Sequence, residues 1–188
     1  MKRIFIAVDV LPSSRLKEDY ELIRHRMRLE KINWVEIEQM HLTLSFLGDT
    51  EEEKVPGIIT MLKEFIAEQS PFELTLRSLG VFKNLREPRV LWMGCDPCTA
   101  LAEIKKKIDQ GLTRYGFEAE DRPFSPHVTL GRIKDIRQLN QLAQLITLFK
   151  DKVFQQQRID KIVLYESVLS VKGPEYSPLQ IIPLQASF

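Results

Sequence analysis

The sequence predicts an α+β fold of mainly antiparallel sheet, with two similar lobes and helices on the outside. Candidate strands come in pairs instead of alternating strictly with helices, which argues against a doubly wound fold. Each half contains a helix pattern and one strand with the tetrapeptide His-x-Thr-x. No Pro/Gly/Ser-rich linker separates the halves. We therefore expect residues 1–188 to form a single two-lobed, pseudo-symmetric domain, with its site in the cleft between the lobes.

The first half is expected to contain three strands and two helices. Residues 3–10 are a short β-branched and aromatic run closed by Pro12, which predicts a buried strand. A helix over 13–30 begins at a Ser cap. One face of it carries four apolar residues, Leu16, Tyr20, Ile23 and Met27. Further strands are predicted at 32–37 and 41–48, and a helix at 51–68 whose acidic start suits a helix N-terminus.

The second half follows a similar order. A long turn joins two predicted strands, and Gly116 ends the predicted helix that comes next. The predicted elements are strands at 72–82 and 89–95, a helix at 98–116, a strand at 127–133, a helix at 139–149, one long strand at 158–170, and a turn with a last strand within 171–185.

Composition limits the function. The chain is 44% hydrophobic and 28% charged with a formal net charge of +1, which argues against coating long nucleic acid but allows recognition of one phosphate or a short RNA end. Asp9 and Pro12 interrupt the first apolar run, so no signal peptide is predicted. No stretch approaches the ~20 apolar residues of a membrane span. We expect a soluble cytoplasmic protein without a membrane segment.

Two of the three histidines lie in the repeated tetrapeptide, in "HLTL" at 41–44 and "HVTL" at 127–130. Alternate side chains of a strand share a face. His41 and Thr43 should therefore point one way while the intervening leucine points into the core, and His127 and Thr129 should do the same. Two strands with polar residues on a solvated face are the simpler explanation, but the repetition favours a functional site.

If the two faces meet across a cleft, two imidazoles and two hydroxyls converge. Imidazole titrates near pH 6.5, so such a pair can act as general base and general acid. Hydroxyl groups can donate hydrogen bonds to phosphate oxygens, and a nearby arginine would help to hold the charge. No Asp, Glu or Cys cluster accompanies the pair at metal-ligand spacing, and two histidines alone make a poor metal site. We expect no metal and no cofactor.

Several segments carry a family resemblance over nearly the whole chain: "RIFIAVDVLP", "MHLTLSFLGD", "LGVFKNLREPRVLWMG", "RPFSPHVTLGRI" and "LYESVLSVKGPEYSPL". The paired motifs resemble the two-histidine (2H) phosphoesterase superfamily. The flanking segments resemble its RNA 2′,3′-cyclic phosphodiesterase branch, historically called 2′-5′ RNA ligases.

The resemblance implies a hydrolase that opens 2′,3′-cyclic phosphate ends of RNA, or small cyclic nucleotides, to 2′-phosphates without metal. It implies that His41 is the acid protonating O3′ and His127 the base activating water, although the two equivalent motifs leave these roles exchangeable. Thr43 and Thr129 would bind the phosphate oxygens in a monomeric enzyme. Two alternatives stay open: the reverse 2′-5′ joining of RNA ends, and an RNA-end binding module without turnover.

Arg132 follows His127 by five residues, where the family often has an arginine near the phosphate. Strict alternation places it on the opposite face, so it reaches the site only if Gly131 permits a bulge or bend. By the same alternation Phe46 falls opposite His41 and is expected in the core. Trp34 and Trp92 could stack a base, but are also expected in the core.

Two other signals carry less weight. His25 lies mid-helix among arginines and is expected to be solvated. Cys95 and Cys98 form a C-x-x-C pair without a second ligand pair to complete a zinc site. Their role stays open.

Overall fold

A computed structural model of the chain describes residues 1–66, 68–118, 123–170 and 173–185. Within them the strands are β1 (Lys2–Asp9), β2 (Lys31–Trp34), β3 (His41–Thr50), β4 (Phe72–Phe82), β5 (Val90–Cys95), β6 (His127–Asp135), β7 (Val153–Ile159), β8 (Lys161–Ser170) and β9 (Gly173–Pro183). The α-helices are α1 (Ser14–Arg26), α2 (Val55–Ile66), α3 (Thr99–Leu112) and α4 (Leu139–Leu148). Short 3₁₀ turns are η1 (Ile37–Gln39), η2 (Glu52–Lys54) and η3 (Thr113–Tyr115).

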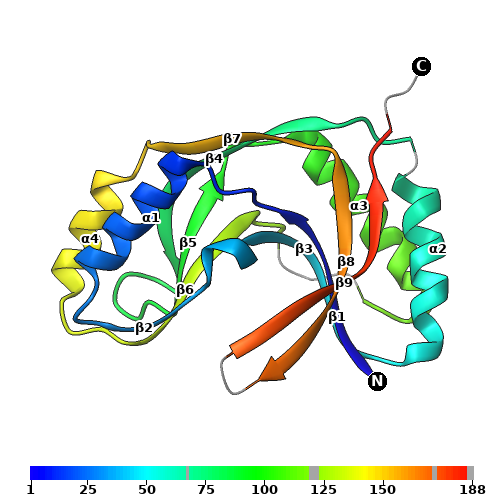
Figure 1. Cartoon of the computed structure of the whole chain (residues 1–188), viewed down its shortest axis with the longest axis horizontal. Helices are drawn as coiled ribbons and strands as arrows, with labels where there is room; N and C mark the ends of the chain where they lie inside the picture. The colour runs from blue at the N-terminus through cyan, green and yellow to red at the C-terminus, as the bar shows by residue number, and fades with distance from the viewer. Residues whose placement is uncertain (67, 119–122, 171–172, 186–188) are drawn as a thin grey trace.

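The strands form one antiparallel sheet in the order β7-β4-β5-β6-β3-β1-β8-β9, with β2 also paired to β6. The two strands that carry the tetrapeptides, β3 and β6, are neighbours in its middle, and three further strands follow on each side. Figure 1 shows α1 and α4 at one side of the curled sheet and α2 and α3 at the other. The predicted two-lobed α+β fold is confirmed.

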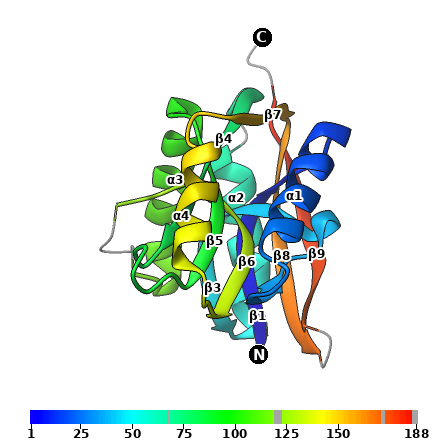
Figure 2. The ribbon, with the colours of Figure 1, turned by 90° about the vertical axis from the view of Figure 1, so that its left-hand side faces the viewer.

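Helices cover one face of this sheet. In Figure 2, which faces the side carrying α1 and α4, these two helices lie in front of the strands. The four apolar residues predicted on one face of α1 are all at most 1% exposed. Leu42, Leu44, Val128 and Leu130 from the two central strands belong to the same core. The alternate side chains of these strands therefore face away from the helices.

The boundaries differ from prediction at several places. The helix predicted at 13–30 ends at Arg26. The helix predicted at 98–116 ends at Gly116 (φ +83°) as expected, but its last turn is the 3₁₀ turn η3. The helix predicted at 51–68 begins with η2, and α2 starts at Val55. Residues 171–172, the first two of the segment predicted as a turn and a last strand (171–185), lie outside the described residues.

The single long strand predicted at 158–170 is wrong, because the chain turns at Asp160 between β7 and β8. The start of β7 was missed since its three consecutive glutamines interrupt the apolar pattern. Two of these glutamines bind the backbone of Leu11. Gln155 Nε2 donates to the Leu11 carbonyl (2.9 Å), and the Leu11 N–H donates to Gln157 Oε1 (3.1 Å). These hydrogen bonds satisfy backbone groups of the segment between β1 and α1, which is not paired in a strand ladder.

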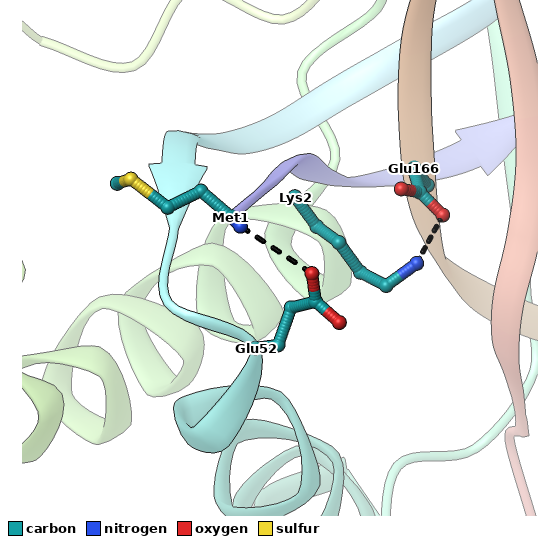
Figure 3. Close-up of polar contacts among 4 residues, drawn as sticks. All are labelled: Met1, Lys2, Glu52 and Glu166. Carbon is teal, nitrogen blue, oxygen red and sulfur yellow. Dashed lines mark hydrogen bonds and ion pairs between the residues drawn. The ribbon is translucent and has the colours of Figure 1, made fainter.

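Ion pairs hold the start of β1 (Figure 3). Lys2 Nζ lies 2.7 Å from Glu166 on β8, and the Met1 amino group lies 3.3 Å from Glu52. The Met1 pair is exposed and the Lys2 pair is partly buried, so both fix the strand end more than they stabilise the fold. Separately, none of the helices in the described parts of the chain is long and apolar enough to span a bilayer.

The contact between β3 and β6 is expected to dominate stability. Leu42 is 0% exposed and pairs with Val128 across the two strands, so Leu42→Ala should cost about 2–5 kcal/mol of unfolding free energy. Leu148→Ala on α4 is the matched control, since Leu148 is 62% exposed and should change stability by less than about 0.5 kcal/mol. Urea denaturation measures both; equal losses would contradict the assignment of the core.

Candidate active site

The strands β3 and β6 carry the same irregularity. Against β1, Thr43 pairs with Ala7 but Ser45 pairs with Ile6, so Leu44 is an extra residue. Against β5, Thr129 pairs with Trp92 but Gly131 pairs with Leu91, so Leu130 is extra in the same way. Two consecutive buried residues follow each threonine. Each strand therefore contains a β-bulge directly after its motif.

The bulges bring the next residue of each strand back to the face of the histidines. On β6 this residue is Arg132, so the bulge on which its approach to the site depended is present. On β3 it is Phe46, which is 51% exposed, and its expected burial in the core is wrong. Gly131 suits the β6 bulge because a Cβ there would lie 2.6 Å from Ile32 Cγ2 on β2.

The antiparallel register arranges the four motif side chains around the centre of the sheet. Leu42 pairs with Val128. One residue to either side, His41 therefore lies across from Thr129, and Thr43 lies across from His127. Each imidazole thus neighbours the hydroxyl of the other motif, and the two motifs are related by a local pseudo-two-fold axis. The structure brings all four predicted residues together.

Both imidazoles are oriented by the same local contact. His41 Nδ1 lies 2.8 Å from the carbonyl oxygen of Gln39, and His127 Nδ1 lies 2.8 Å from that of Ser125. A carbonyl oxygen can only accept, so each Nδ1 carries the hydrogen. The opposite nitrogen, Nε2, is then free to accept a proton when the ring is neutral, or to donate one when it is charged.

Aromatic rings support each histidine. The His41 ring lies 4.9 Å from Phe5 and 5.1 Å from Tyr176, and the His127 ring lies 4.8 Å from Phe82 and 6.5 Å from Trp92, all between ring centroids. Trp92 was expected in the core, but it borders the site. Such packing limits ring rotation and keeps Nε2 pointing at one position.

A cavity of about 720 Å³ adjoins the motifs on the His41 side. Its walls come from the centre of β3 and β6, from the segment between β2 and η1, and from the end of β8 and the start of β9. Its lining includes His41, Thr43, Thr129, Arg132, Trp34, Glu36, Gln39, Glu175 and Tyr176. Trp34 is thus a second tryptophan that borders the site, although the core was expected. The volume falls in the range of small-molecule sites.

Burial lowers the pKa of His41 below its ordinary value of 6.5, and the nearby His127 lowers it further. The Gln39 carbonyl and Asp9 act in the opposite direction. Asp9 accepts a hydrogen bond from the Tyr165 hydroxyl (2.6 Å). His41 is consequently neutral at neutral pH in the unliganded protein.

The remaining candidates lie outside this site. Within the described residues no group of three or more His, Cys, Asp or Glu side chains is placed to hold a metal ion. Cys95 and Cys98 are free thiols, and burial raises the pKa of Cys95 to about 11, which makes it a poor nucleophile. His25 is exposed on α1 beside Arg28, as expected.

The fold and the paired motifs define the class of two-histidine phosphoesterases. The chain belongs to the 2′-5′ RNA ligase superfamily, whose family model matches residues 14–168.

Relatives and solved structures agree with this family. The chain is 33% identical to the RNA 2′,3′-cyclic phosphodiesterase of Methanocaldococcus jannaschii, covering 95% of this chain and 98% of that protein. It is 30% identical to the RNA 2′,3′-cyclic phosphodiesterase of Methanothermobacter thermautotrophicus, covering 97% of this chain and 98% of that protein. Crystal structures of TT0787 from Thermus thermophilus (TM-score 0.80, 24% identity, 99% and 100% covered) and of E. coli LigT with 3′-AMP (0.75, 25%, 97% and 98%) share the fold.

The pKa of His41 can be tested by NMR titration of its imidazole, with the three histidines assigned by substitution. We expect a pKa below 6.5, and a further decrease in Asp9→Asn because Asp9 raises it. Between the folded and unfolded pKa values the unfolded chain binds more protons, so this histidine makes the folded chain less stable as pH falls through that window. A His41 pKa at or above 6.5 would contradict the assignment.

Proposed function

We propose that this chain hydrolyses the 2′,3′-cyclic phosphate of RNA ends, or of small cyclic nucleotides, to a 2′-phosphate. The observation that carries the proposal is the juxtaposition of two HxT motifs across the Leu42–Val128 pair. The RNA 2′,3′-cyclic phosphodiesterases found among its relatives support the same substrate class. The adjoining cavity has room for a nucleoside.

The proposed reaction uses the two histidines as acid and base. Water attacks phosphorus in line with the P–O3′ bond, one histidine takes the proton of that water through Nε2, and the other protonates O3′ as the bond breaks. The product carries a 2′-phosphate and a free 3′-hydroxyl. Thr43 and Thr129 donate hydrogen bonds to the non-bridging oxygens, and Arg132 balances the charge that develops on them.

The two histidines are given different roles in the proposed reaction. We assign His41 as the acid and His127 as the base, an assignment that the pseudo-two-fold relation allows to be exchanged. The lowered pKa of His41 in the unliganded protein means that an acid role needs the phosphate anion, which favours the charged imidazolium when it binds. Binding of substrate would then supply the proton-donating form.

The other parts of the proposal concern context. Every catalytic group comes from one chain, which supports action as a monomer and as one two-lobed domain over residues 1–188. The two free thiols suit the reducing cytoplasm. The motifs themselves supply both the acid and the base, so the reaction is proposed to need neither metal nor cofactor.

The histidines can be tested with phosphorus NMR of a 2′,3′-cyclic nucleotide in excess EDTA. Wild-type protein should yield a 2′-phosphate resonance, and His41→Ala or His127→Ala should each lower kcat by about 10²–10⁴-fold, the usual contribution of general acid–base catalysis. The third histidine supplies the control: His25→Ala, exposed on α1, should retain the wild-type rate.

Each other outcome of this experiment has a definite meaning. A 3′-phosphate product would overturn the assignment of O3′ as the leaving group. Absence of turnover on both a cyclic nucleotide and a short RNA with a cyclic end would replace the hydrolase with an RNA-end binding module. Turnover that is seen without EDTA but lost when EDTA is added would overturn the metal-free mechanism.

Arg132 is expected to act on the transition state. Arg132→Gln removes the cation from the phosphate site and should lower kcat/KM by about 10²-fold, whereas Arg132→Lys should retain part of the activity because the charge remains. Arg15→Gln, at an exposed position of α1, is the matched control. Steady-state kinetics at constant salt measure all three, and equal rates for the two glutamine variants would exclude a role for Arg132.

A further inference from the structure

Phe46 occupies an unusual position for a phenylalanine. Within the described residues every other aromatic side chain is buried or partly buried, whereas Phe46 is 51% exposed. It lies directly across from Phe5, whose ring touches His41, and opposed residues of an antiparallel pair share a face. Phe46 therefore lies on the catalytic face, although the fold gains little from its exposed half.

Arg3 lies over the ring of Phe46, and we call these two side chains together the platform. The guanidinium carbon of Arg3 lies 5.0 Å from the centroid of the Phe46 ring. Arg3 forms no ion pair within the described residues, although Asp49 is its partner in the strand register. The neighbouring Lys2 is occupied by Glu166 (Figure 3). The cation of Arg3 is thus held over an aromatic ring and, within the described residues, has no carboxylate that neutralises it.

The platform is close to the phosphate site but outside the adjoining cavity. Phe46 follows Thr43 by three positions, a span of at most about 10 Å along an extended strand. Phe46 does not line the 720 Å³ cavity that contacts the motifs. A nucleoside in that cavity therefore leaves the platform available for another part of the same substrate.

Symmetry supports the same conclusion. Phe46 and Arg132 are equivalent residues of the two halves, each following a bulge and each five residues after a motif histidine. The catalytic phosphate needs a cation, which Arg132 provides. An exposed ring with a cation at the equivalent place is the combination that binds single-stranded nucleic acid, because bases stack on the ring and phosphates attract the cation.

We propose that Phe46 and Arg3 form a second nucleotide subsite, which binds the nucleotide immediately before the cyclic phosphate end of a single-stranded RNA. The base stacks on Phe46, and Arg3 contacts the connecting phosphodiester. This inference rests on the proposed function, and it makes RNA a better substrate than a cyclic mononucleotide.

The test compares two substrates with the same terminal nucleoside, a 2′,3′-cyclic mononucleotide and a short single-stranded RNA with a cyclic end. Phe46→Ala should raise KM for the RNA about tenfold without changing kcat, which corresponds to about 1.4 kcal/mol and falls in the range for one stacked base. For the mononucleotide, KM should change less than twofold. Leu148→Ala is the control, and an unchanged urea midpoint shows that each variant is folded.

Direct binding separates this proposal from the proposed function. Fluorescence anisotropy of a labelled single-stranded RNA ending in a 2′-phosphate reports affinity without turnover. Phe46→Ala should weaken binding about tenfold at every salt concentration. Arg3→Gln should make the slope of log affinity against log salt less steep by about 0.7, as expected for one lost phosphate contact with a single strand; Arg15→Gln should leave the slope unchanged.

The results are read independently for the two proposals. Equal KM increases for both substrates, or no change in RNA affinity for Phe46→Ala, would overturn the second subsite while leaving the hydrolase intact. Wild-type protein that binds the RNA through Phe46 but hydrolyses neither substrate would overturn the hydrolase while supporting the subsite.

Discussion

The antiparallel contact between β3 and β6 is the constraint on which the site depends. Each half of the sheet ends at the centre with a strand bearing His-x-Thr-x, and the buried pair Leu42–Val128 joins these two strands. Because side chains alternate, this register fixes which imidazole meets which hydroxyl. A slip of one residue would turn one motif into the core. The same contact that closes the hydrophobic core therefore assembles the catalytic groups.

The two bulges convert this contact into a binding face. An extra residue in each strand increases twist and ends regular pairing, so β3 and β6 share a short contact and then separate. The halves support their bulges differently. Ser45 donates to Asp109 (3.1 Å) and accepts from Lys105 (3.0 Å), both on α3, whereas Gly131 leaves space for β2. The backbone geometry is repeated although the side chains that hold it are not.

Much of this was predictable, because the elements and the motif faces depend on local periodicity. The exceptions share one cause. Strict alternation cannot detect an extra residue, so Phe46 was assigned to the core and Arg132 needed an assumed bulge. Trp92 faces the site because its partner Thr129 does, a fact of pairing that its own sequence neighbours do not encode. The start of β7 was missed since its glutamines bond to a distant loop instead of alternating with apolar residues.

The pseudo-symmetry suits the phosphate but not the whole substrate. Both histidines use a carbonyl two residues earlier to fix the same tautomer, so the centre presents two equivalent imidazoles to one phosphorus. A nucleotide, however, has its nucleoside on one side only. The cavity walls provide this asymmetry, because β2, the end of β8 and the start of β9 line the cavity on the His41 side. In the described parts of the chain β2 pairs with β6 alone. Symmetric strands supply the chemistry, and the elements added asymmetrically around them determine which way the substrate lies.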